Sequence, residues 1–168
     1  RWILAEFQNT MHTVESSWSN LDIYTATQAL KTFGTGLLPS HYLEMVKSRL
    51  YDDDEAAAWT LHRIVRDFMA AFSPVCPFFT HHISSTVYGT SSVDVDAFPS
   101  APLTDVAFGT DEGGRLCGLS HALQEFNGQT WAKKKEAGIS LNQPIAGLSI
   151  PDELTEFTAT LTRMHQLE

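Results

Sequence analysis

Apolar residues recur at every third or fourth position through most of the chain, which is the spacing of helices with one buried side. The first such stretch runs from residue 1 to about residue 17. Its apolar positions are Leu4, Phe7, Met11 and Val14. A second stretch begins after Asp22, a residue type that caps helix N-termini. The two stretches predict a pair of amphipathic helices joined by a turn at residues 16–20.

A kink or short break is expected before the next helix. Gly34, Gly36 and Pro39 lie close together there, and both residue types disfavour regular helix. The helix predicted next covers residues 40–51. Its apolar stripe comprises Tyr42, Leu43, Val46 and Leu50. Lys47 and Arg49 fall on the two flanks of this stripe, beside the core rather than opposite it.

Counting the interrupted stretch from Asp22 to residue 51 as one helix, a third helix is predicted over residues 54–72, opened by four acidic residues that suit a helix N-terminus. Its core side comprises Leu61, Ile64, Val65, Phe68 and Phe72. Trp59, Arg63 and Arg66 lie on nearly the opposite side of the same helix. Two interpretations stay open. Trp59 covers a neighbouring helix or loop, or it is a stacking platform with cationic neighbours, as recognition of single-stranded RNA requires.

Two further helices are predicted on either side of an irregular connection. Pro74 and Pro77 end one helix and start the next, because proline lacks an N–H but fits a first helical turn. Residues 91–99 alternate like a short extended segment, and proline and glycine punctuate residues 100–110. The fifth helix follows, weakened in its middle by Gly128. Its apolar face comprises Leu116, Leu119, Leu123 and Phe126.

The last part of the chain joins a basic helix end to an alternating segment. Lys133, Lys134 and Lys135 either complement the dipole of their helix or contact phosphates, as the concentrated positive patch of an acidic chain. Residues 146–150 alternate and predict a strand, and a last helix begins near Pro151.

The pattern as a whole predicts a mainly α fold. We expect a helical bundle of four to five helices over residues 1–138, with the irregular connection at about 91–110. A small, truncated α/β appendage over residues 139–168 is expected to follow. The 168 residues are 43 % apolar and 11 % aromatic, which suits a globular domain. The abrupt start at Arg1 suggests a fragment of a longer protein.

Charge and composition narrow the functions that this chain can have. Acidic residues outnumber basic ones by 20 to 11, so any RNA contact must be local or supported by another domain. Cys76 and Cys117 lack metal or disulfide spacing, which favours a reduced, cytoplasmic protein. No apolar run approaches the roughly 18 residues of a membrane span, so no membrane partner is expected. No phosphate loop, nucleophile elbow or metal motif is present, and the adjacent His81 and His82 face different directions on a helix. We therefore predict no catalytic residue and no metal site.

Four motifs resemble the anticodon-binding domain of class I aminoacyl-tRNA synthetases, the valyl branch in particular. They are Tyr42-Leu43-Glu44 with Lys47 and Arg49-Leu50, then Pro74 with Pro77-Phe78 and Thr80, then the extended segment 91–99, then the basic helix end that leads from Lys133 through Gly138 and Leu141 to Pro144. Residues 81–82 depart from the family, which usually has two acids there. The family's active-site signatures, His-x-Gly-His and Lys-Met-Ser-Lys-Ser, are absent from this chain.

The resemblance implies a domain that binds the anticodon stem-loop of a tRNA. A catalytic domain elsewhere in the same polypeptide would join valine to that tRNA with ATP and Mg²⁺. The segment itself would hold no cofactor and be inactive alone. Anticodon contacts in the family lie near the first and third helices, which would place Trp2 beside Trp59 and Arg63. The candidate tRNA-binding residues are Trp2, Trp59, Arg63, Arg66, Lys47, Arg49, Lys133, Lys134 and Lys135.

Two alternatives remain open at this point. One is the equivalent domain of an isoleucyl enzyme; the Tyr-Leu-Glu string favours the valyl branch. The other is a helical protein-interaction module without an RNA role, which the acidic net charge of −9 mildly favours. Binding of an anticodon stem-loop that falls steeply with salt would separate an RNA-binding domain from such a module.

Overall fold

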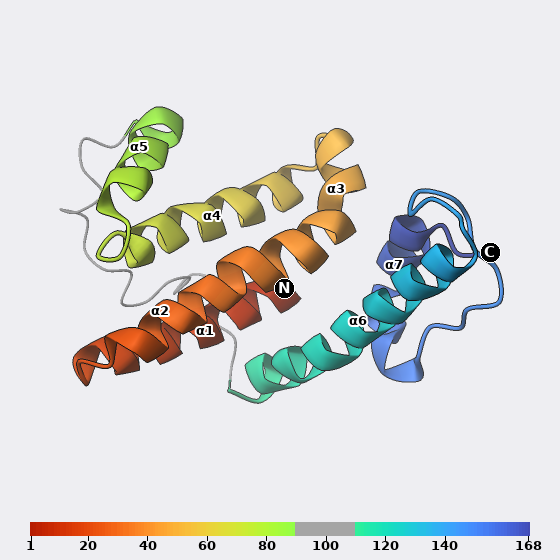
Figure 1. Ribbon diagram of the computed structural model, residues 1–168, viewed down its shortest axis with the longest axis horizontal. Coiled ribbons are helices and arrows are strands. Elements are labelled where there is room, and N and C mark those ends of the chain that lie inside the picture. Colours follow the sequence, from red (N-terminus) through yellow and green to blue (C-terminus); the bar gives the residue numbers. More distant parts are fainter. Residues whose placement is uncertain (90–109) are drawn as a thin grey trace.

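The computed structural model describes residues 1–89 and 110–168, and these residues form a bundle of helices (Figure 1). The elements are α1 (Trp2–Ser19), α2 (Ile23–Thr32), a π-helical segment η1 (Phe33–Leu43), α3 (Glu44–Tyr51), α4 (Glu55–Phe72), α5 (Pro77–Tyr88), α6 (Thr110–Glu136), a 3-10 segment η4 (Asp152–Phe157) and α7 (Thr158–His165). The predicted mainly α fold is confirmed. The expected extended segment and connection at residues 91–109 lie outside the described residues.

Local capping chemistry sets several of these helix boundaries. The Asp22 carboxylate accepts a hydrogen bond from the Thr25 N–H at 3.0 Å and so caps α2. The Asp54 carboxylate accepts one from the Ala57 N–H at 3.0 Å and caps α4 in the same way. α5 begins at Pro77, as the sequence predicted. Both capping contacts span three residues, which is why the sequence pattern alone could predict that helices begin near Asp22 and Asp54.

The expected break around residues 34–39 is instead a widened helix. η1 carries the chain from α2 into α3 as π-helix, with Pro39 inside it. π-Helix is rare, and the missing N–H of proline is one reason for a departure from regular α-helix here. Gly34 has a packing role in this segment. A Cβ atom at residue 34 would lie 2.6 Å from Cζ of Phe68, so glycine allows η1 to approach α4 closely.

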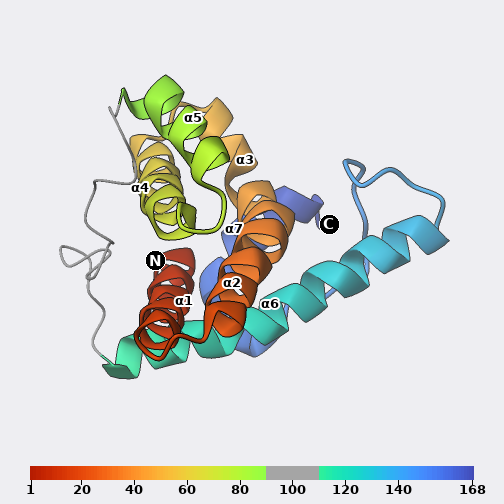
Figure 2. The same ribbon diagram turned by 60° about the vertical axis from the view of Figure 1, so that its left-hand side comes forward.

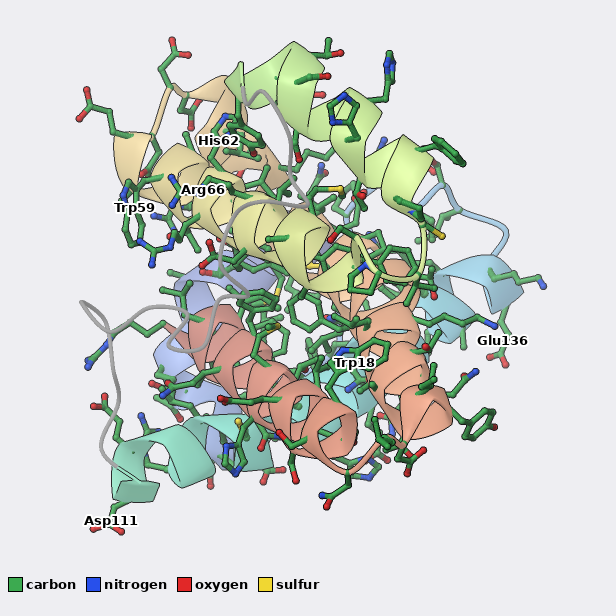
Figure 3. All side chains as sticks on the ribbon, turned by 90° about the vertical axis from the view of Figure 1, so that its left-hand side faces the viewer. Trp18, Trp59, His62, Arg66, Asp111 and Glu136 are labelled. Atoms are coloured by element: carbon green, nitrogen blue, oxygen red, sulfur yellow. The ribbon has the colours of Figure 1, made fainter. Side chains whose placement is uncertain are left out.

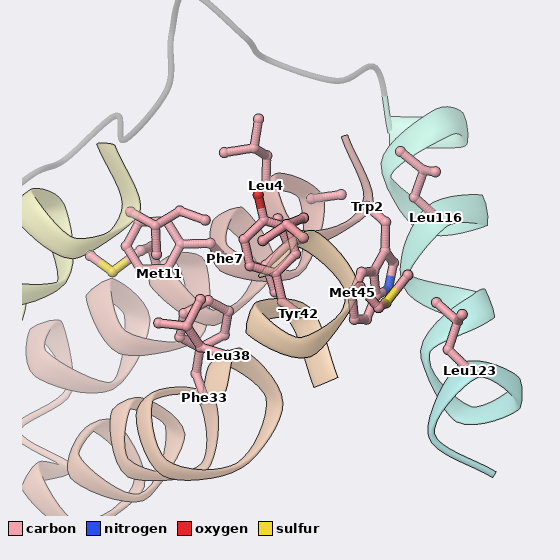
Figure 4. Packing of buried hydrophobic residues seen from close by; sticks show 14 of the residues in the cluster. Trp2, Leu4, Phe7, Met11, Phe33, Leu38, Tyr42, Met45, Leu116 and Leu123 are labelled. Carbon is pink, nitrogen blue, oxygen red and sulfur yellow. The ribbon is translucent and has the colours of Figure 1, made fainter. Parts of the chain in front are cut away.

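α1 lies at the centre of the bundle and contacts α2, η1, α4 and α6. Its Phe7 is fully buried, and the ring centroid lies 5.1 Å from that of Phe33 in η1. Burying a side chain of this size contributes roughly 1.5–3 kcal/mol. Figure 4 shows this part of the core continuing through Trp2 and Met45 to Leu116 and Leu123 of α6. The core therefore joins helices from both halves of the chain.

The C-terminal segment packs back on the bundle. η4 contacts α6, and α7 contacts α3. The side chains of Leu154 and Leu161 are fully buried in the same hydrophobic cluster as α1 and α6. Figure 2 shows α6 as a long helix that extends past α1 and α2, with the segment after it turning back toward α7. The expected boundary at residue 138 stays a prediction about domain organisation.

The prediction of a strand at residues 146–150 is wrong. Between residue 110 and the C-terminus the pairing is limited to one isolated parallel bridge, between Ile145 and Leu167. Gly147 has a φ of 77°, which turns the backbone away from extended geometry at the middle of the segment. The alternation of side chains was real, but a strand also needs a neighbour along its length, and here only Ile145 has one.

No helix in residues 1–89 or 110–168 has the length and apolar character that a membrane span needs.

Candidate nucleic-acid interface

Trp59 stands on the exposed side of α4, as the sequence pattern predicted. Its side chain is 46 % exposed, whereas Ile64 on the opposite side of the helix is fully buried. His62, Arg63 and Arg66 follow at spacings of three, four and seven residues, which places them on one helical face with Trp59. Trp59, His62 and Arg66 are labelled along α4 in Figure 3. The face combines an aromatic ring with cationic side chains.

Tyr88 of α5 completes a hollow of about 230 Å³ beside this face. We call it the α4–α5 hollow; it is lined by Trp59, His62, Arg63, Arg66 and Tyr88. The Tyr88 hydroxyl donates a hydrogen bond to the His62 carbonyl at 3.3 Å, and the two rings pack edge to face with centroids 5.9 Å apart. Burial raises the pKa of Tyr88, while the charge of Arg66 opposes that shift. The contact fixes α5 against the exposed side of α4.

The two arginines of this face have different surroundings. Arg63 donates from Nε to Oδ2 of Asp67 at 2.9 Å, and its side chain is 23 % exposed. Arg66 is 64 % exposed, with Nε 3.9 Å from Oδ1 of the same carboxylate. Asp67 itself is buried. A buried carboxylate needs a partner, so Arg63 has a structural task that Arg66 shares only weakly. Arg66 is the cation of this face that extends furthest into solvent.

A second, larger hollow of about 800 Å³ also includes Trp59 in its lining. We call it the α1–α4 hollow; it is lined by Arg1, Leu4, Tyr42, Arg49, Glu55, Ala56, Ala57, Trp59 and Thr60. Arg49 donates from Nε to Asp54 at 2.8 Å, and Arg1 pairs with Glu112 at 2.7 Å. Burial raises the pKa of Tyr42. The lining of this hollow therefore includes both hydrogen-bond donors and hydrogen-bond acceptors. Residues from the start of α1 and from α4 line it together.

Comparison with known proteins assigns the chain to a family. Residues 1–149 match the family model described as the anticodon-binding domain of tRNA ligase. The chain belongs to this family. The prediction made from the four sequence motifs is thus confirmed.

Relatives of the anticodon-binding domain are proteins named valine–tRNA ligase. The one from Saccharolobus solfataricus is 29 % identical over 87 % of this chain and 17 % of its own length. Those from Aeropyrum pernix and Methanothrix thermoacetophila are 27 % and 30 % identical, over 97 % and 92 % of this chain. The chain spans 20 % and 17 % of those two relatives. It therefore corresponds to about a fifth of a longer type of protein.

Trp2 does not lie on the exposed face of the anticodon-binding domain, which does not support its predicted role as a tRNA contact. Its side chain is only 3 % exposed. The indole Nε1 donates to Oγ of Ser120 at 2.7 Å, and the ring packs edge to face on Phe157. Trp2 fills the junction between α1, α6 and the C-terminal segment. Its neighbour Arg1, rather than Trp2, shares a hollow with Trp59.

Lys134 is buried as well, which does not support its predicted role as a phosphate contact. Its Nζ donates to three backbone carbonyls, those of Leu141 and Gln143 at 2.7 Å and of His165 at 2.9 Å. Burial lowers the pKa of this lysine. The flanking Lys133 and Lys135 are exposed. Lys134 therefore ties the end of α6 to two later segments of the anticodon-binding domain.

The remaining candidates lie on the surface without joining one site. Lys47 is 53 % exposed and lies 3.5 Å from Glu44, the pair that helical spacing suggests. Lys47 lines neither hollow, whereas Arg49 lines the α1–α4 hollow. His81 and His82 are both exposed on α5. Within the part of the domain that the structure describes, no group of three His, Cys, Asp or Glu residues is placed to hold a metal ion.

Two residues of the α4–α5 hollow were missed by sequence reasoning, for different reasons. His62 lies three residues after Trp59, so the helical spacing that selected Arg63 would have selected it too. Tyr88 lies on another helix, 26 residues after His62. The residue spacing within α4 cannot indicate that a side chain from α5 completes the hollow.

Proposed function

We propose that this chain binds the anticodon arm of a valine tRNA as part of a valine–tRNA ligase. The observation that carries the proposal is the family match over residues 1–149. Proteins named valine–tRNA ligase are also similar in sequence to most of this chain. Ligation of valine, with ATP and Mg²⁺, is the task proposed for a catalytic domain in the rest of the parent polypeptide. The presence of two free cysteines fits our proposal that the protein works in the cytoplasm.

The exposed face of α4 is the contact surface that we propose. Unstacked RNA bases bind to aromatic side chains and to the planes of arginine guanidinium groups. Trp59 offers an exposed ring, and Arg66 offers a solvent-directed cation beside it. Because the whole chain carries a net charge of −9, a phosphate backbone is attracted only where basic side chains gather. The local combination of ring and cation meets that condition.

The test is binding of a synthetic valine-tRNA anticodon stem-loop to the 168-residue chain, measured by titration at several salt concentrations. Base stacking is worth roughly 1–3 kcal/mol by alanine substitution. Trp59→Ala should therefore weaken binding about 5- to 150-fold, at 1.4 kcal/mol per decade. Phe78→Ala is the matched control, because Phe78 is a 91 % exposed aromatic residue that lines neither hollow. It should leave the affinity unchanged.

Two outcomes would contradict this proposal at different levels. Absence of salt-dependent binding to any anticodon stem-loop would contradict RNA binding itself and favour the protein-interaction alternative. If the stem-loop binds tightly and Trp59→Ala and Phe78→Ala weaken binding equally, the proposal of RNA binding would stand, but the α4 face would be rejected as the contact surface. Circular dichroism on both variants shows whether an effect on binding arises from loss of the fold.

A further inference from the structure

Trp59 borders two hollows that share no other residue in the described part of the chain. The α4–α5 hollow lies on the side of His62 and Arg66, and the α1–α4 hollow lies on the side of Arg49 and Thr60. A half-exposed aromatic residue that lines two hollows can contact a ligand group in each of them. An aromatic residue at the edge of one hollow would offer a stacking surface to that hollow alone.

The two hollows differ in size. The α4–α5 hollow, at about 230 Å³, is smaller than the roughly 300–1,000 Å³ clefts that hold drug-sized ligands. The α1–α4 hollow, at about 800 Å³, falls within that range. The smaller hollow thus suits a single planar base, and the larger one has room for a base with its ribose.

The two hollows also differ in chemistry. The α4–α5 hollow presents the Arg66 guanidinium and the His62 and Tyr88 rings, which suit stacking and an adjacent phosphate. The α1–α4 hollow includes the Glu55 carboxylate and the Thr60 hydroxyl beside Arg49. A carboxylate accepts hydrogen bonds and a hydroxyl both donates and accepts, so this side suits the polar edge of a base.

We infer that Trp59 separates two adjacent nucleotides of the bound RNA loop, with one base seated in each hollow. The inference rests on the proposed function and adds how two neighbouring bases are distributed between the two hollows of that site. In the free loop the two bases would stack on each other, and in the complex each base contacts the Trp59 indole instead. Splaying of neighbouring bases is the way in which single-stranded RNA exposes its edges to proteins.

The test is photocrosslinking of the 168-residue chain to anticodon stem-loops that carry 5-iodouridine at one loop position at a time. The iodinated base couples to aromatic rings that it stacks on, and mass spectrometry of the digested complex identifies the peptide. Two adjacent loop positions should each crosslink to the peptide that contains Trp59. Trp59→Leu should lose both crosslinks, and Trp59→Phe, which keeps a planar ring, should retain both.

Variants on each side of Trp59 sharpen the test. Arg66→Ala should lose the crosslink at one of the two positions, and Glu55→Gln should lose it at the other, because each lines one hollow alone. A Trp59 crosslink at a single position, or at two positions that are not neighbours, would overturn the inference. Parallel loss of both crosslinks in Arg66→Ala and in Glu55→Gln would also overturn it.

The failure of this inference is distinguishable from failure of the proposed function. A stem-loop that binds with salt-dependent affinity but crosslinks to Trp59 from one position leaves RNA binding intact and removes the separation of bases. A stem-loop that does not bind at all contradicts both.

Discussion

The exposed face of α4 and the C-terminal end of α6 both carry clustered positive charge in the sequence, yet they differ in the folded domain. On α4, Arg63 and Arg66 lie three residues apart and share one face with Trp59. On α6, three consecutive lysines point in directions about 100° apart, and the middle one is buried. The comparison shows that the number of basic residues in a segment does not give the number of exposed charges, because packing buries Lys134 on α6 and pairs Arg63 with Asp67 on α4.

The end of α6 uses its buried lysine as part of a polar network. His165 Nε2 lies 2.8 Å from Oδ1 of Asn127, whose Nδ2 lies 3.2 Å from Nδ1 of His41. The His165 carbonyl accepts from Lys134. Burial, followed by the charge of Lys134, lowers the pKa of His165 to about 4. The network joins η1, α6 and the end of α7, whereas on the α4 face the Arg66 side chain stays directed to solvent.

The largest effect on stability is expected from Lys134→Ala. It leaves the carbonyls of residues 141, 143 and 165 without their donor, which should cost about 3 kcal/mol of unfolding free energy. Lys133→Ala and Lys135→Ala are matched controls on the same turn and should stay within about 0.5 kcal/mol of the wild type. Urea unfolding measures all three. Equal losses of unfolding free energy for the three lysine variants would contradict the claim that Lys134 has a structural role that its exposed neighbours lack.

The next effect is a pH dependence that belongs to the α6 end. The pKa of His165 is about 4 in the folded chain and about 6.5 when unfolded, so its contribution is fully present above pH 6.5. The contribution is lost as the pH falls toward 4, because the unfolded state then binds a proton that the folded state resists. The loss should reach up to about 3 kcal/mol.

The measurement compares urea unfolding of the wild type and His165→Gln between pH 7 and 4. Carboxylates titrate in both proteins, so the difference between their two curves isolates the histidine. The wild type should lose more stability than the variant over this range. Parallel curves would contradict a neutral, buried His165.

A smaller difference is expected between the two arginines of α4. Arg63→Ala leaves the Asp67 carboxylate buried without its 2.9 Å partner, which should cost about 2 kcal/mol. Arg66→Ala should cost less than about 0.5 kcal/mol, because its side chain is 64 % exposed. For stem-loop binding the order should reverse, and Arg66→Ala should reduce the slope of log affinity against log salt by about 1. An unchanged slope in Arg66→Ala would remove that arginine as a phosphate contact.

The smallest effect is expected for RNA binding at the α6 end. Figure 3 has Trp59 and Glu136 on opposite sides of the molecule, so a loop that binds to α4 leaves the exposed lysines at its periphery. Lys133→Ala and Lys135→Ala should each weaken stem-loop binding about twofold, the effect of roughly 0.5 kcal/mol from an exposed charge. A loss as large as that of Trp59→Ala would move the main contact surface from α4 to α6.

Sequence reasoning succeeded where the physical cause lies within one or two helical turns. The caps at Asp22 and Asp54 and the start of α5 at Pro77 follow from contacts between near neighbours in the chain. The exposure of Trp59 follows from its place opposite the core stripe of its own helix. Residues 146–150 do not form the predicted strand, because among the described residues no segment pairs with them. The burial of Trp2 was not foreseen, because the residue that it bonds lies far along the chain. Trp2 bonds Ser120, which is 118 residues away.

By itself the sequence determined the helical class, the main helix boundaries, the family and the aromatic and cationic face of α4, because spacing and capping are properties of a single segment. Only the tertiary structure decided that Tyr88 completes the α4–α5 hollow, that Arg1 rather than Trp2 lies near Trp59, and that Lys134 is buried. These depend on which helices meet. A residue on an amphipathic helix has its direction set locally, but whether solvent or another helix lies in that direction is set by packing across the whole chain.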